Sequence, residues 1–88
     1  MVSEVELLEV FRLGEAAGVE EVVREVGDRL AAAWLGVSRF REVLALTDRS
    51  HRVQTSGSTL LYAGHAKGML GDPDGALDDY QQALPIFR

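Results

Sequence analysis

The chain has 88 residues, enough for a single domain; 47% of them are hydrophobic and none is cysteine. The lack of cysteine excludes disulfides, thiolate catalysis and cysteine-based zinc sites, and it fits a reducing compartment, so we expect a cytoplasmic protein. The net charge of −5 argues against nucleic acid as the main partner. No secretory signal and no run of about 18 apolar residues is present, so no membrane association is expected.

Helical patterns dominate the chain, and no sustained alternation of apolar and polar residues predicts a strand. The first helix is expected over residues 3–13, because Ser3 can serve as its N-cap and Gly14 as its end. Its apolar stripe of Leu7, Leu8 and Phe11 is narrow. Residues 1–18 are interpreted as either an added helix or the remnant of an earlier structural unit.

The second helix is expected over residues 19–35, where apolar side chains recur at helical spacing. Gly27, in its middle, costs about 1 kcal/mol relative to alanine. This glycine predicts either a bend or a break at which Asp28 caps a new helix. A third helix is expected to start at the N-cap Ser38 and to run to about residue 53.

The fourth helix, expected over residues 58–70, is rich in glycine and alanine, which allow a neighbouring helix to approach closely. The fifth begins at Asp72-Pro73, a good N-cap followed by a residue suited to the first helical position. Its expected inner stripe is Ala76, Leu77, Tyr80, Ala83, Leu84 and Phe87. Pro85 cannot donate a backbone hydrogen bond, so a kink or a stop is expected near Leu84.

Small and apolar residues at fixed places mark the last helix–turn–helix: Leu60, Gly64, Leu70-Gly71-Asp72, Ala76, Tyr80, Ala83, Leu84 and Ile86. With them, residues 57–88 resemble a tetratricopeptide repeat (TPR), a helical hairpin of about 34 residues. The resemblance implies that Gly64 and Ala76 stand where the helices cross and that Tyr80 fills the space between them. A degenerate copy lies one repeat earlier, over about 20–53, and departs from the pattern at Val43, Thr47 and Ser50.

The expected fold is all-α, a single domain over 1–88 of stacked antiparallel helical hairpins with about five helices, similar to a fragment of a TPR solenoid. It divides into an extra N-terminal helix (1–18), the degenerate repeat (19–55) and the clear repeat (56–88). The repeat also looks like helical arrays of bacterial signalling proteins. The chain ends inside an apolar stretch, which favours a fragment of a longer array.

The TPR resemblance implies a non-catalytic protein–protein interaction scaffold, because stacked repeats form a groove that holds a partner peptide. The groove would be lined by Leu61, His65, Met69, Ala32 and Leu35. The chain has no asparagine, so the carboxylate clamp of some family members is absent. Two repeats leave apolar ends uncovered, so a homo-oligomer is expected through Leu84, Ile86 and Phe87.

Two alternative functions have weaker support. Arginines at positions 39, 41, 49 and 52 are the only support for a helix-turn-helix DNA-binding regulator, and the acidic net charge opposes it. A small helical enzyme would need convergent polar residues, and His51 and His65 lack the spacing of a metal or catalytic pair. Helix capping accounts for Asp72 and Asp74 better than a calcium loop does. No catalytic residue, metal or cofactor is therefore expected.

Overall fold

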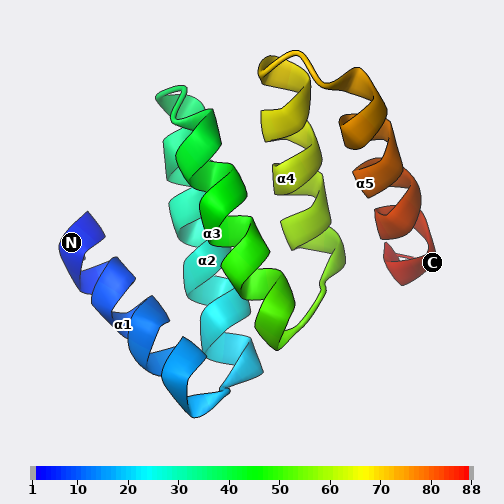
Figure 1. Cartoon of the computed structure of the whole chain (residues 1–88). Helices are drawn as coiled ribbons and strands as arrows, with labels where there is room; N and C mark the ends of the chain where they lie inside the picture. Colours follow the sequence, from blue (N-terminus) through cyan, green and yellow to red (C-terminus); the bar gives the residue numbers. More distant parts are fainter. Residues whose placement is uncertain (1, 88) are drawn as a thin grey trace.

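The computed structural model describes residues 2–87, and the side chains of residues 2–85. These residues form five helices and no strand: α1 (Glu4–Ala17), α2 (Glu20–Gly36), α3 (Phe40–Val53), α4 (Gly57–Met69) and α5 (Pro73–Phe87). Successive helices run antiparallel and lie beside one another as hairpins (Figure 1). The predicted all-α class is confirmed. Within the described part of the chain, no helix has the length and apolarity needed to cross a bilayer.

The end of α1 lies later than predicted. The helix continues through Gly14 and ends at Gly18, whose φ of 68° is left-handed. Gly14 is buried because α2 packs against it, and a Cβ at this position would lie 2.7 Å from Cγ1 of Val22. The prediction that Gly14 ends the helix is therefore wrong, since this glycine serves close helix packing.

Helix α2 runs unbroken through Gly27, so the predicted bend or break there is not needed. The ring of Phe11 and the hydroxyl of Ser50 lie so close that a Cβ at Gly27 would be 3.1 Å from Cε2 and 2.9 Å from Oγ, respectively. Asp28 is no helix cap: its carboxylate accepts hydrogen bonds from Ser58 (2.5 Å) and Thr59 (3.3 Å) at the start of α4.

The start of α3 and the end of α5 also differ from the predictions. Ser38 is not the N-cap of α3, because it has a positive φ of 62° and the helix begins at Phe40. Helix α5 continues past Pro85 to Phe87, so the predicted stop near Leu84 is wrong. Pro85 has no N–H to donate to the carbonyl oxygen of Gln81, so the hydrogen-bond ladder loses one bond in the last turn of the helix.

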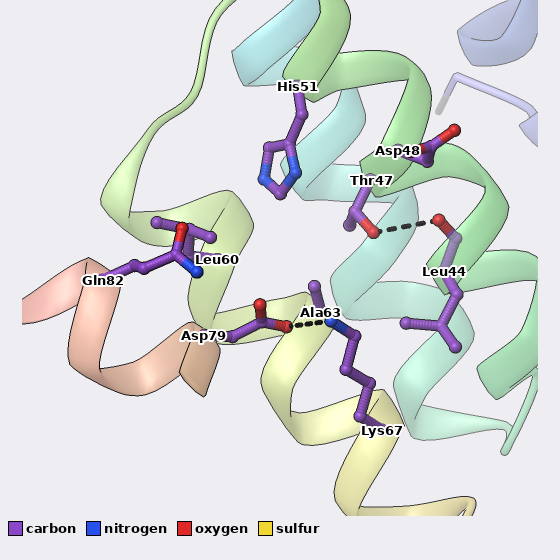
Figure 2. A pocket seen from close by; sticks show the side chains of 9 residues that line it. All are labelled: Leu44, Thr47, Asp48, His51, Leu60, Ala63, Lys67, Asp79 and Gln82. Carbon is purple, nitrogen blue, oxygen red and sulfur yellow. Dashed lines mark hydrogen bonds and ion pairs between the residues drawn. The ribbon is translucent and has the colours of Figure 1, made fainter. Parts of the chain in front are cut away.

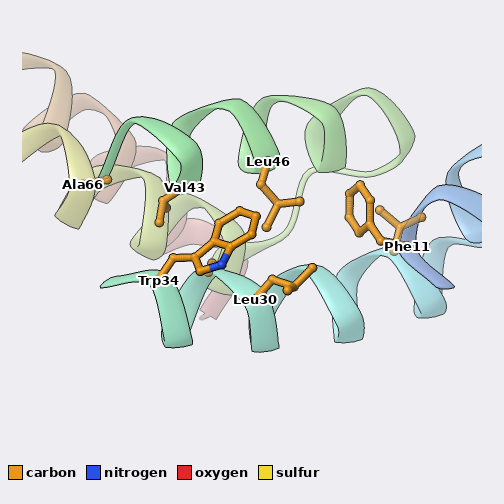
Figure 3. Close-up of a cluster of buried hydrophobic side chains, with 8 residues drawn as sticks. Phe11, Leu30, Trp34, Val43, Leu46 and Ala66 are labelled. Atoms are coloured by element: carbon orange, nitrogen blue, oxygen red, sulfur yellow. The ribbon is translucent and has the colours of Figure 1, made fainter. Parts of the chain in front are cut away.

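The hydrophobic core lies among α1, α2, α3 and α4 (Figure 3). It contains Phe11, Val23, Leu30, Ala31, Trp34, Val43, Leu46 and Ala66. Helix α5 adds mainly Ala76 and Ala83, so it is held by close contact with α4 rather than by large buried side chains. A Cβ at Gly64 would lie 2.6 Å from Cε1 of Tyr80, and one at Gly68 would lie 3.9 Å from the Cβ of Ala76.

The turns α2–α3 and α4–α5 have the same backbone conformation. Ser38 and Gly71 both have positive φ, 62° and 86°. The N–H of each donates to the carbonyl oxygen three residues earlier, at 3.2 Å in both turns. The next residues, Arg39 and Asp72, donate to the carbonyl oxygen five residues earlier, at 2.9 and 2.8 Å. Ser38 and Gly71 are 33 residues apart (71 − 38). This offset relates equivalent positions of the two hairpins, and we call it the repeat register.

Candidate functional site

A polar cleft lies where α3, α4 and α5 meet, with a cavity of about 230 Å³. Figure 2 shows the side chains that line it, which come from the three helices. They are Leu44, Thr47, Asp48 and His51 of α3, Leu60, Ala63 and Lys67 of α4, and Asp79 and Gln82 of α5. Sequence reasoning missed this cleft, because its charged residues are spread over three helices and follow no known motif.

Asp79 is the most deeply buried charged residue of the cleft, with 5% of its surface exposed. The Nζ of Lys67 lies 2.9 Å from its Oδ2, and this ion pair joins α4 to α5. Oδ2 is buried and accepts no further hydrogen bond within the described part of the chain. A carboxylate at such a site costs free energy unless its oxygens are well satisfied. Asp79 therefore retains capacity to accept a hydrogen bond.

His51 lies across the cleft from Asp79 and Lys67 (Figure 2). Its Nε2 is buried and has no hydrogen-bond partner. Burial lowers the pKa of His51; the negative charges of Asp79 and Asp48 oppose this effect, while Lys67 adds to it. The imidazole is therefore mainly neutral at pH 7, and one of its ring nitrogens can accept a hydrogen bond.

The remaining polar groups of the cleft are turned partly toward their own helices. Asp48 accepts a hydrogen bond from Arg52 at 2.9 Å, and both side chains of this pair are largely exposed. Gln82 donates from Nε2 to Asp78 at 2.8 Å, one turn earlier on α5. The hydroxyl of Thr47 donates to the carbonyl oxygen of Leu44 at 3.1 Å.

The arrangement in the cleft suits binding. The hydroxyl of Thr47 donates to a backbone carbonyl oxygen. The described residues also include no group of three histidine or acidic side chains that could hold a metal ion. The cleft presents the carboxylates of Asp48 and Asp79 and the neutral imidazole of His51 to a ligand. The ammonium group of Lys67 competes with a cationic ligand for these acceptors.

The predicted groove residues lie on the neighbouring helices α2 and α4. Leu61 and Met69 are 41% and 59% exposed, and His65 and Ala32 are also exposed. Leu35 is only partly exposed, because it packs against the hydrophobic core. None of these five residues lines the polar cleft.

The predicted self-association residues fall on α5. Leu84 is 54% exposed, whereas the side chains of Ile86 and Phe87 lie outside those that the structure describes. Sequence reasoning placed Leu77 and Tyr80 on the inner stripe of this helix; Leu77 is 55% exposed, and Tyr80 contacts Gly64 with its ring but is still 38% exposed. The buried face carries Ala76, Ala83 and the ion-paired Asp79 instead.

The arginines that favour DNA binding are mostly engaged within the chain. Arg39 pairs with Glu4 at 2.6 Å and also with Glu42, and it lies over the ring of Trp34. Arg49 pairs with Glu15 at 2.7 Å, and Arg52 pairs with Asp48 at 2.9 Å. Their charges are therefore compensated by the protein's own carboxylates, which weakens any basic surface for a phosphate backbone.

Comparison with protein-family models, with curated proteins and with solved structures finds no match for this chain.

Proposed function

We propose that this chain is a non-catalytic protein–protein interaction module built from TPR-like hairpins, which associates with a second copy of itself through α5. The observation that supports this most strongly is an apolar face on α5 that is exposed, although the equivalent face of α3 is covered. The proposal includes a cytoplasmic, bacterial setting without a cofactor.

The two equivalent turns support the assignment to TPR-like repeats. Ser38 and Gly71 repeat the same backbone conformation, and their separation along the chain is close to the family's period of about 34 residues. The contact of Tyr80 with Gly64 also follows the family pattern.

The repeat register predicts which face of α5 should dock a neighbour. Thr47 of α3 is 3% exposed, and Leu44 and His51 are only partly exposed, because α4 and α5 lie beside them. Their equivalents one repeat later are Tyr80, Leu77 and Leu84, all exposed. Covering such a face contributes about 25 cal/mol per Å² of apolar area removed from water. A symmetric pair of α5 helices would cover it on both copies.

A second surface would receive the partner peptide. The predicted groove residues of α2 and α4 present apolar rather than charged side chains, with His65 as the only ionisable member. An apolar segment of a partner, held between these two helices, fits this composition. The paired arginines speak against the alternative of a helix-turn-helix regulator, so no nucleic-acid partner is proposed.

Light scattering coupled to size-exclusion chromatography tests the self-association. We expect the wild-type chain to show a mass well above the monomer's 9.6 kDa at micromolar concentration. The double variant Leu77→Gln/Leu84→Gln should shift to the monomer, because it makes the α5 face polar. Leu61→Gln on α4 is the matched control and should leave the mass unchanged. A wild-type mass of one chain at all concentrations would refute the proposal.

A further inference from the structure

The repeat register relates α1 to α3 and α3 to α5. The space between α1 and α3, which we call the first gap, is therefore equivalent to the space between α3 and α5, which we call the second gap. In the first gap, an arginine of the later helix reaches back to the earlier one. Arg49 donates from Nε and Nη2 to the carboxylate of Glu15, at 3.0 and 2.7 Å. Its guanidinium lies 5.0 Å from the centre of the Phe11 ring. The first gap is therefore closed by a guanidinium held between a carboxylate and an apolar side chain.

The second gap keeps the acceptor and the apolar side chain but lacks the guanidinium. One repeat after Phe11, Glu15 and Arg49 stand Leu44, Asp48 and Gln82, respectively. Gln82 is too short to imitate arginine, and its amide donates along its own helix to Asp78. All three equivalents line the cavity of about 230 Å³. The cavity thus lies where the register predicts a guanidinium.

The second gap is also more polar than the fold requires. The residues one repeat before His51, Lys67 and Asp79 are Gly18, Trp34 and Leu46. Trp34 and Leu46 are buried in the hydrophobic core, so the first gap has apolar side chains where the second has Lys67 and Asp79. Asp79 is nearly buried with its charge offset by Lys67, and His51 has a buried nitrogen without a hydrogen-bond partner; both cost free energy compared with apolar packing. Their presence indicates a ligand that satisfies them.

The charges of the cleft favour a cationic ligand with several hydrogen-bond donors. Asp48 and Asp79 stand against the single ammonium of Lys67, and His51 is mainly neutral because burial lowers its pKa. The pair of Asp48 with Arg52 is largely exposed and contributes little to stability, so a ligand can displace it. Guanidinium provides five donors in a planar fork that matches a carboxylate.

We propose that the cleft between α3 and α5 binds an arginine side chain of a partner protein, in the position that Arg49 takes between α1 and α3. This inference rests on the proposed role as a protein-binding module and names the residue that it recognises. The guanidinium pairs with Asp48 and with the acceptor atoms of His51 and Asp79, and the aliphatic stem lies along Leu44. The cavity is smaller than the roughly 300–1,000 Å³ of drug-sized pockets, which suits one side chain.

Amide NMR titration of the full chain with the peptide acetyl-Gly-Arg-Gly-amide at low salt tests this inference. We expect saturable shifts at the cleft residues of α3, α4 and α5, with at least tenfold weaker binding of the citrulline and lysine versions. Asp48→Asn should weaken binding about tenfold, as expected for loss of a charged hydrogen-bond partner. Asp74→Asn removes the same charge from an exposed position of α5 outside the cleft, and it should have no effect.

A second variant tests the register directly. Gln82→Arg places an arginine in the second gap, as Arg49 is placed in the first. We expect it to abolish peptide binding and to raise the Tm, because its own guanidinium then occupies the cleft. Peptide binding that persists in folded Gln82→Arg, shifts that map elsewhere, or equal binding of the citrulline peptide would each overturn the inference. The mass of the wild-type chain tests the proposed self-association separately, so failure of one proposal is distinguishable from failure of the other.

Discussion

The contact between α4 and α5 predicts opposite effects on stability when either of two glycines on α4 is replaced by alanine. Gly64 and Gly68 lie one turn apart on α4, and both face α5. A Cβ at Gly64 would lie 2.6, 3.0 and 3.1 Å from three atoms of the Tyr80 ring. A Cβ at Gly68 would lie 3.9 Å from the Cβ of Ala76, an ordinary van der Waals distance. Alanine therefore fits at one position and collides at the other.

The magnitude follows from two opposing effects. Replacing a glycine inside a helix by alanine stabilises the helix by about 1 kcal/mol at either position. Overpacking typically costs about 1–3 kcal/mol, and it applies only at Gly64, where the Tyr80 ring must move. We expect Gly68→Ala to raise the free energy of unfolding by about 1 kcal/mol. Gly64→Ala should leave it unchanged or lower it by up to about 2 kcal/mol.

Urea unfolding followed by circular dichroism measures both variants, and Tyr80→Ala provides the control. Without the ring, Gly64→Ala has nothing to displace and should stabilise the protein by about 1 kcal/mol, like Gly68→Ala. Equal stabilisation by both alanines in the wild-type background would show that Tyr80 does not press on Gly64. The close approach of the two helices would then be refuted.

Three further substitutions have clear expected outcomes. Ser38→Gly removes the side chain from a residue with a left-handed φ, so it should stabilise the protein by about 1 kcal/mol in thermal unfolding. If the variant is not more stable than the wild type, the turn assigned to Ser38 is contradicted. Gly27→Ala should leave the stability unchanged or lower it by up to about 2 kcal/mol, because its Cβ crowds Ser50 and Phe11, whereas the Cβ of Gly36→Ala meets no atom within 4 Å and should not destabilise. Burial lowers the pKa of His51, so folding favours the neutral imidazole; its contribution to stability is complete above pH 6.5 and declines as the pH falls below that value. His51→Gln should flatten urea-measured stability between about pH 7 and 5, and an unchanged slope would refute the buried neutral state.

The sequence was informative where one residue has one structural meaning. The serine cap of α1, the Asp72-Pro73 start of α5 and the class of the fold could all be predicted. Gly14 and Gly27 could not be interpreted alone, because a glycine inside a helical pattern signals either an end or a close neighbour. No residue near Ser38 predicts its positive φ. Its equivalence to Gly71 in the repeat register would have predicted it, because a glycine in a turn often has a positive φ.

The polar cleft could not be predicted because its members come from three helices. Each residue looks like an ordinary surface residue in its own segment, and only the packing of α3 and α5 on α4 brings His51, Lys67 and Asp79 together. A comparison between the two repeats was nevertheless possible from sequence, because Asp48 and Gln82 stand at the equivalent positions of Glu15 and Arg49.

Site-directed crosslinking tests the proposed pairing of α5 most directly, since the natural chain contains no cysteine. Gln81→Cys places one thiol beside the exposed leucines of α5, and Leu61→Cys places one on α4. Under mild oxidation, we expect the α5 variant to form a disulfide-linked dimer rapidly and at low concentration, while the α4 variant forms no disulfide-linked dimer. Equal or faster crosslinking through α4, or no dimer through α5, would contradict a module that associates by this face.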